Sequence, residues 1–95
     1  MKKVVLTGTI EVPAASLDAV RVELPRHVAA TLAEEGCIVF EVEEVRGDPG
    51  CFNVYEEFSS RRAFELHQLR VAGSRWGELT VNASRDYSVR EEDSG

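Results

Sequence analysis

The sequence has few of the features that mark secreted, membrane-spanning or nucleic-acid-binding proteins. It contains only 2 cysteines in 95 residues, too few for the disulfide framework of a small secreted domain. No apolar run approaches the roughly 20 residues that a membrane-spanning helix needs. Acidic residues outnumber basic residues by 17 to 11, and the net charge of -6 disfavours binding to phosphate backbones or anionic lipid. We therefore expect a cytoplasmic protein that binds neither nucleic acid nor membranes.

Motifs for phosphate binding, metal binding and nucleophilic hydrolysis are also missing. The chain has no glycine-rich dinucleotide motif, no P-loop and no nucleophile elbow. Cys37 and Cys51 lack a second Cys or His at zinc-ligand spacing, so we expect packed residues or reduced thiols. We expect neither a metal nor a cofactor.

The length fits one compact domain, which we place at residues 1–90. The acidic end, residues 91–95, is expected to be a flexible tail. A chain of this size buries only about 60 to 65% of its unfolded surface, so an oligomeric partner is expected to add stability.

The first half of the chain predicts a strand, a helix and a hairpin. Residues 4–12 are rich in β-branched side chains and stop at Pro13. A helix is expected from Ser16 to near Glu35, with a kink over residues 22–25 caused by Pro25. Its apolar stripe is Leu17, Val20, Leu24, Val28 and Leu32.

Residues 38–43 and 52–58 alternate between apolar and polar side chains, which predicts a β-hairpin. An even pairing sum of 96 places Ile38 opposite Phe58, Phe40 opposite Glu56, and Val42 opposite Val54. This register separates the two cysteines by more than roughly 20 Å, which excludes a disulfide within one subunit.

The second half predicts another helix from Ser59 or Ser60 through Val71. Its apolar side is expected to hold Ala63, Phe64, Leu66, Leu69 and Val71, with His67 and Arg70 inside the same arc. A short helical turn over residues 74–77 carries Trp76, and strand-like stretches follow at 78–83 and 85–90.

This order predicts an α+β fold of the ferredoxin-like, split βαβ type: β-α-β-β-α-β with an additional C-terminal strand. Helices would cover one face of the sheet. The other face would expose Val39, Glu41, Glu43, Tyr55 and Glu57, and we expect a second subunit to cover it. The three glutamates lack a His or Asp at ligand spacing, so they are expected to be solvated or interface residues rather than metal ligands.

Three motifs follow one another at the spacing seen in a known family. They are residues 34–42 (EEGCIVFEV), residues 52–60 (FNVYEEFSS) and residues 63–67 (AFELH). Together they resemble the antibiotic biosynthesis monooxygenase family over roughly residues 4–89. The resemblance implies a dimeric α+β barrel with a pocket between sheet and helices. It also implies, for some members, oxygenation of aromatic polyketides or quinols by O2 without metal or flavin.

The sequence departs from the family pattern at three places. Glu35 replaces a proline, Phe58 replaces a tryptophan, and residues 71–76 lack the second histidine of the family. The haem-cleaving relatives rely on a histidine in that last segment, so the resemblance does not extend to haem cleavage.

His67, Glu56 and Arg70 are the candidate catalytic residues. A histidine facing an apolar sheet can accept a proton near neutral pH, although it can equally be a structural residue of the core. The hairpin register puts Glu56 on the helix-facing side, where its carboxylate needs His67, Arg70 or a backbone donor. A buried ion pair and general-base catalysis both remain open for Glu56.

The candidate substrate-binding residues are Trp76, Phe40, Phe58 and Phe64, which could form an aromatic wall or belong to the ordinary core. Tyr87 is expected at the partner subunit or at the pocket mouth. The preferred function is a cofactor-independent monooxygenase that acts with O2 on a small aromatic or quinol-type substrate. The alternative is a non-catalytic dimeric module of the same fold that binds small hydrophobic molecules or serves assembly.

Overall fold

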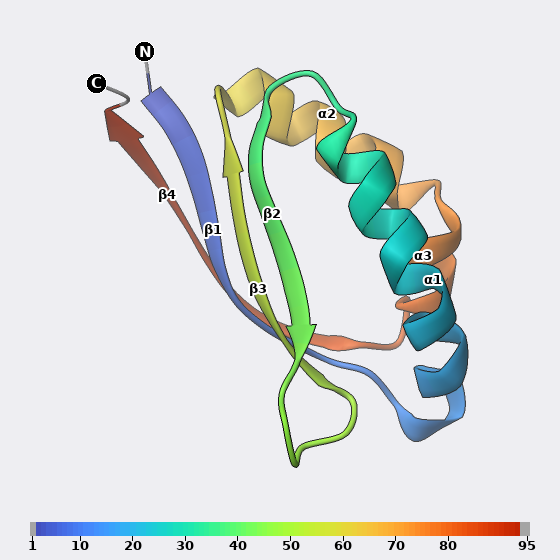
Figure 1. The fold of residues 1–95 in the computed structure, drawn as a ribbon. Helices are drawn as coiled ribbons and strands as arrows, with labels where there is room; N and C mark the ends of the chain where they lie inside the picture. The colour runs from blue at the N-terminus through green and yellow to red at the C-terminus, as the bar shows by residue number, and fades with distance from the viewer. Residues whose placement is uncertain (1, 94–95) are drawn as a thin grey trace.

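The computed structural model describes residues 2–93 and consists of one antiparallel sheet with helices on one side (Figure 1). The sheet has 4 strands in the order β2-β3-β1-β4. The elements in chain order are β1 (Lys2–Glu11), α1 (Ala14–Leu32), β2 (Cys37–Glu44), β3 (Cys51–Phe58), α2 (Arg61–Ala72), α3 (Arg75–Leu79) and β4 (Ser84–Asp93). The predicted ferredoxin-like α+β fold is therefore confirmed.

The predicted additional strand is wrong. Residues 78–83 form the end of α3 and a turn, and a single strand, β4, follows. The local cause is hydrogen bonding that favours a helix: the Ser74 hydroxyl accepts from the Gly77 amide at 3.2 Å, and the Thr80 hydroxyl donates to the Trp76 carbonyl at 2.7 Å. These bonds at the two ends of α3 outweigh the weak strand preference of the segment.

Helix α1 begins and ends earlier than predicted. It starts at Ala14, directly after Pro13, and no side chain caps it, so the expected cap at Ser16 is wrong. It continues through Pro25 to Leu32. Leu32 is 54% exposed, whereas the fully buried stripe of the helix is Val20, His27 and Thr31.

The buried stripe of α2 also differs from the prediction. Phe64 and His67 are buried, with Ala63, Arg70 and Val71 partly buried beside them. Leu66 and Leu69, predicted to be core residues, are mostly exposed. The apolar side of this helix is wider than the stripe that contacts the sheet, so its two leucines lie outside the contact.

The hairpin register is confirmed over most of its length. Phe40 pairs with Glu56 and Val42 with Val54. At the open end, a β-bulge between Cys37 and Val39 places Cys37, not Ile38, opposite Phe58. Ile38 is the extra residue, and it is half exposed. Both cysteines are free thiols.

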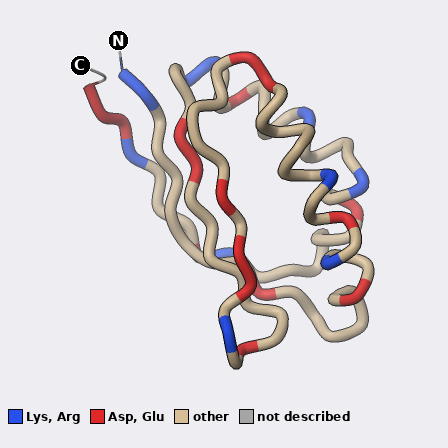
Figure 2. Tube along the Cα trace, in the orientation of Figure 1, with Lys and Arg blue, Asp and Glu red and all other residues tan. Residues whose placement is uncertain are grey.

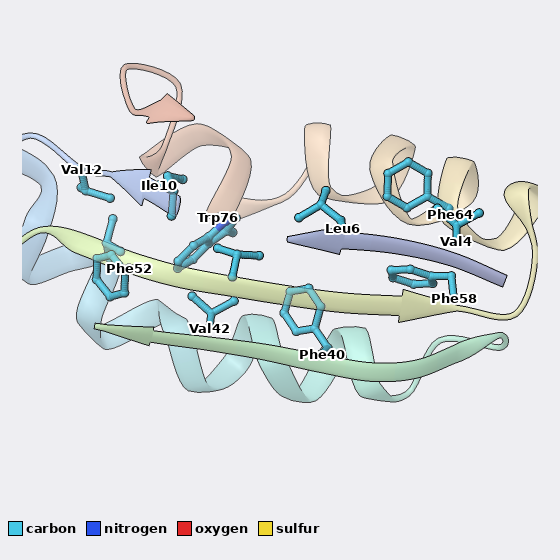
Figure 3. Packing of buried hydrophobic residues seen from close by; sticks show 12 residues of the cluster. Val4, Leu6, Ile10, Val12, Phe40, Val42, Phe52, Phe58, Phe64 and Trp76 are labelled. Carbon is cyan, nitrogen blue, oxygen red and sulfur yellow. The ribbon is translucent and has the colours of Figure 1, made fainter. Parts of the chain in front are cut away.

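The core lies between the sheet and the helices (Figure 3). Its buried residues include Val4, Leu6 and Ile10 from β1, Phe40 and Val42 from β2, and Phe52, Val54 and Phe58 from β3. The alternate residues of the strands face the other side, which we call the open face: Val39, Glu41, Glu43, Tyr55 and Glu57, as predicted. Acidic positions follow one another along β2 (Figure 2), and on the open face the Lys3 ammonium lies 2.9 Å from the Glu57 carboxylate.

The acidic end is not a free tail as far as the structure describes it. Glu91 pairs with Val4, and β4 extends to Asp93, while residues 94 and 95 lie outside the described part. Over residues 2–93, none of the helices is long and apolar enough to cross a membrane. The cytoplasmic location stays a prediction.

Candidate active site

The turn between α1 and β2 brings the end of the first helix against the second. Gly36 makes this approach, with a φ of +91° and so little space that an added Cβ would lie 2.6 Å from the Ala63 Cβ on α2. The Ser59 amide donates to the Gly36 carbonyl at 2.8 Å. As a result, Glu34 on this turn faces the inner side of α2.

Glu34 binds two residues of α2 through its two carboxylate oxygens. Oε1 lies 2.7 Å from His67 Nδ1, and Oε2 accepts from Arg70 Nε at 2.6 Å. Arg70 also donates from Nη2 to the Thr31 hydroxyl on α1 at 2.9 Å. This network fixes the ring of His67, which is only 3% exposed.

His67 turns its other ring nitrogen toward the sheet. Because the Glu34 carboxylate can only accept, Nδ1 is the protonated nitrogen of a neutral ring, and Nε2 carries the lone pair. Burial lowers the pKa of His67, although the hydrogen bond that His67 donates to Glu34 acts in the opposite direction. A neutral imidazole with a free lone pair is a suitable proton acceptor.

Glu56 on β3 is the group that Nε2 faces. Its Oε1 lies 3.9 Å from His67 Nε2, beyond hydrogen-bond distance, and has no hydrogen-bond partner within residues 2–93. The residue is 6% exposed. Burial, and then the negative charge of Glu34, raise the pKa of Glu56 to about 7. Both protonation states of this carboxyl group are therefore populated near neutral pH.

These contacts change the predicted pairing. We expected Glu56 to be neutralised by His67, Arg70 or a backbone donor, whereas Glu34 takes both side chains and leaves Glu56 Oε1 without a bond. The reason is that the turn before β2 brings Glu34 into contact with α2, and sequence spacing does not reveal this contact.

The four predicted aromatic residues gather around His67. Phe40 meets the His67 ring edge-on at a centroid distance of 5.5 Å, and Phe58 lies tilted at 4.8 Å. Phe64 packs edge-on against Phe58 at 5.8 Å. Trp76 reaches the cluster through a residue that the sequence analysis missed, His27 on α1. All seven predicted site residues thus belong to one connected cluster.

His27 stacks flat on the Trp76 indole, with a centroid distance of 4.4 Å and an interplanar angle of 2°. It also meets Phe40 edge-on at 5.3 Å. Burial lowers the pKa of His27 to about 4, and the positive charge of Arg70 acts in the same direction. The residue had a detectable signal: it follows Val20 by seven positions and precedes Thr31 by four, so all three share a helix face.

Tyr87 extends the cluster toward the β4 edge. It pairs with Gly8 and, by strand alternation, faces the helix side; an added Cβ on Gly8 would lie 2.9 Å from its Cδ1. Burial raises its pKa, and the Glu56 carboxylate adds to the effect. Tyr87 therefore lies on the helix-facing side of β4 and packs against the core, and its expected place at a partner subunit or a pocket mouth stays a prediction.

The cluster is closely packed, and two hollows lie elsewhere. One, of about 130 Å³, is on the open face and is lined by Glu41, Glu43, Asn53, Val54 and Tyr55. The other, of about 300 Å³, is lined by Glu35, Gly36, Ser59, Ser60, Arg62, Ala63 and Leu66. Neither hollow is lined by His67, Glu56 or Trp76.

Within the described range, 2–93, no group of three or more His, Cys, Asp or Glu residues is placed to hold a metal ion. The sequence prediction of a reaction without metal or cofactor stays a prediction.

The protein combines an antiparallel sheet, covered by helices on one side, with a histidine and glutamates between the two layers. The sequence profile of the antibiotic biosynthesis monooxygenase family matches residues 3–71. The chain therefore belongs to the antibiotic biosynthesis monooxygenase family, which confirms the resemblance given by its motifs. No curated protein matches the sequence.

Solved structures agree on the fold. A candidate antibiotic biosynthesis monooxygenase from Nitrosomonas europaea has a TM-score of 0.75 at 16% identity, with 95% of this chain and 96% of that chain covered. Another from Deinococcus radiodurans has a TM-score of 0.68 at 24% identity, with 97% and 92% covered. A conserved protein of Bacteroides thetaiotaomicron, described as a candidate oxidoreductase, has a TM-score of 0.72 at 16% identity, with 96% and 98% covered. At these identities the likeness shows the fold alone.

Proposed function

We propose that the protein is a cofactor-independent monooxygenase that oxidises a small aromatic substrate of the quinol type with O2. One observation carries the proposal: the unbonded carboxylate oxygen of Glu56 faces the lone-pair nitrogen of His67, inside an aromatic cluster. Membership of the family supports a monooxygenase in general terms. The choice of substrate and the use of O2 belong to the proposal.

His67 and Glu56 supply the two proton acceptors that the reaction needs. His67 Nε2 takes the proton of a ring hydroxyl, which makes the ring electron-rich enough to react with O2 directly. Glu34 holds the histidine in the required tautomer and stabilises the imidazolium that forms, as a carboxylate does in a catalytic triad. Glu56, with a pKa of about 7, is present partly as carboxylate and accepts the second proton.

The reaction balances without another reductant, because the substrate supplies all four electrons. The quinol anion forms a bond from a ring carbon to O2, and His67 returns its proton to the peroxide. Glu56 then removes the hydrogen on that carbon, the O–O bond breaks, and the released hydroxide takes this proton to become water. The ring carbon ends as a carbonyl, so a quinol and O2 give a hydroxyquinone and water.

Access to the cluster requires local movement. The five-residue helix α3 packs on α1 and α2 and carries Trp76, which lies within the core between Phe52 and Phe40 (Figure 3). We propose that α3 shifts to admit the flat ring between Trp76 and the phenylalanines. The closed packing then excludes water from the reacting anion.

The proposal includes a homodimer formed through the open face. This face leaves Val39 and Tyr55 half-buried beside the exposed Glu41 and Glu43. A second sheet laid on it would cover the apolar side chains and the hollow between Glu41 and Tyr55. Size-exclusion chromatography with light scattering would measure the molar mass and so test the dimer. The charge-reversing Glu41→Lys variant is expected to weaken the dimer.

A second candidate function is favoured by the closed packing. His67 is held by Glu34, and neither hollow reaches it. A non-catalytic dimer that binds small hydrophobic molecules would have the same core without turnover. Thermal melting with added hydrophobic ligands, in the absence of O2 uptake, would favour this alternative.

The deciding experiment follows naphthalene-1,4-diol with ¹⁸O2. The monooxygenase should form 2-hydroxy-1,4-naphthoquinone carrying one ¹⁸O atom, whereas spontaneous oxidation gives the unhydroxylated quinone and hydrogen peroxide. His67→Ala should abolish the labelled product while the protein stays folded. Arg62→Ala, an exposed change on the same helix, should keep it. Equal labelled product from wild type and His67→Ala would contradict the mechanism.

A further inference from the structure

His27 is a buried histidine whose ring lacks a hydrogen-bond partner on one side. It is 5% exposed, and its Nδ1 is fully enclosed without a partner among the described residues. Buried polar atoms are nearly always satisfied, so such an atom needs an explanation. A ligand atom that is absent from the free protein is one.

The surroundings of His27 are those of a site for a flat ring. Trp76 covers one face of the imidazole, Phe40 meets it edge-on, and the His67 centroid lies 6.5 Å away. With a pKa of about 4, His27 is neutral at physiological pH and offers either one N–H or one lone pair at Nδ1. It can therefore bind a neutral oxygen, as a hydroxyl or a carbonyl group, without placing a charge in the core.

Glu56 is the second buried residue with an unpartnered atom, and the two lie on different sides of the cluster. Glu56 Oε1 is on the sheet beside His67, and His27 Nδ1 is on α1 beside Trp76. Aromatic side chains occupy the space around both. The arrangement thus provides two separated polar ends and an apolar middle, which matches a flat ring with an oxygen at each end.

We propose that His27 is a specificity-determining residue that hydrogen-bonds the second oxygen substituent of a dioxygenated aromatic substrate. This inference rests on the proposed function, since the first hydroxyl is placed at His67 and Glu56. A site with a buried polar group rejects analogues that lack the matching substituent, because the group is then left unpaired. His27 therefore selects quinols over monophenols.

The test compares binding of naphthalene-1,4-diol and 1-naphthol under argon, so that no turnover occurs. Titration calorimetry gives the two Kd values, and the fluorescence of Trp76 reports occupancy at the site, because the chain has 1 tryptophan. Wild type is expected to bind the diol about tenfold more tightly, the effect of one buried hydrogen bond. His27→Phe keeps an aromatic ring and should remove this preference, with 1-naphthol bound within about twofold of wild type.

Two variants complete the comparison. His27→Gln restores a hydrogen-bonding group and should recover part of the preference, while Arg26→Gln, on the exposed neighbour, should leave it unchanged. An undiminished preference in His27→Phe, or an equal loss for both ligands, would show that His27 only packs. Failure of wild type to bind either compound would also overturn the inference.

A measurement on the wild-type protein tests the same role without depending on whether the variants fold. With ¹⁵N-labelled histidine, the His27 Nδ1 resonance should move on addition of the diol and stay in place with 1-naphthol. If binding depends on His27 but no labelled hydroxyquinone forms under ¹⁸O2, the oxygenation fails and the specificity role stands. If the labelled product forms and the His27→Phe preference is unchanged, only the specificity role fails.

Discussion

One carboxylate oxygen of Glu34 lies 2.7 Å from Nδ1 of His67, and this contact sets the chemistry of the opposite ring nitrogen. The residues are far apart in sequence, one on the turn after α1 and the other on α2. Their contact connects the two helices and directs Nε2 toward Glu56 on the sheet. The histidine is therefore held by the helical layer and acts toward the strand layer.

Glu34→Gln should lower the pKa of His67 and destabilise the protein. The Glu34 carboxylate raises this pKa against the lowering effect of burial. Loss of the carboxylate removes that opposing effect, so the pKa falls further. Arg70 and His67 also lose charge-assisted bonds, at a cost of about 2 kcal/mol. Histidine NMR titration and urea unfolding measure the two effects. Glu35→Gln, on the exposed neighbour, is the matched control, and equal behaviour of the two variants would contradict the role of Glu34.

Glu56→Gln should stabilise the protein at alkaline relative to acidic pH. The folded pKa of about 7 lies above the ordinary value of 4.5 for a glutamate, so the folded state binds more protons between these values. Wild-type stability from this group is consequently lost as pH rises from 4.5 to 7. The unfolding free energy of the variant relative to that of wild type should grow by at most about 3 kcal/mol over this range. Urea unfolding at pH 5 and pH 8 checks it, and a difference that does not change with pH would refute the raised pKa.

His27 should affect stability in the opposite direction. Its folded pKa of about 4 lies below the ordinary value of 6.5 for a histidine, so the unfolded state binds more protons in this interval. The contribution of His27 to the free energy of unfolding is fully present above pH 6.5. It is lost as the pH falls toward 4, by at most about 3 kcal/mol. His27→Phe removes the titrating group, and its unfolding free energy should fall less than that of wild type between pH 7 and pH 4. A parallel fall in both proteins would show that His27 does not titrate as expected.

Gly36→Ala should cost more stability than Gly47→Ala. Both glycines have positive φ, +91° and +80°, but only the Cβ at position 36 would collide with a neighbouring side chain. The shared backbone strain is about 1 kcal/mol, and the collision with Ala63 adds to it. Urea unfolding of the two variants gives the comparison. Equal losses would mean that the turn moves away from α2 without resistance.

The fold was predictable because strand alternation and helix spacing agree along most of the chain. The pairing of Phe40 with Glu56 follows from alternation alone, and it correctly placed Glu56 among buried residues. Periodicity failed where apolar residues exceed the contact surface, as at Leu66 and Leu69. It also failed at residues 78–83, where side-chain hydrogen bonds at Ser74 and Thr80 decide the local structure.

The gathering of the candidate residues in one cluster was predictable, but their pairing was not. The seven predicted residues meet in one cluster, since each lies on the inner side of its element or reaches the inner layer. Glu34 was missed as a partner because its position depends on a turn, and His27 because a polar residue was not counted in the stripe of α1. Their roles as catalytic and binding residues remain to be measured.

The bulge at Ile38 makes the number of residues between Glu34 and Phe40 a functional quantity. Removing Ile38 would give an uninterrupted ladder, yet it would shorten the path from the sheet to Glu34 by about 3.3 Å. The carboxylate would then be drawn away from His67, although the sheet itself would pair more regularly. A length change at this surface position thus differs from ordinary loop variation: one amino acid too few would leave the fold in place and uncouple its two layers.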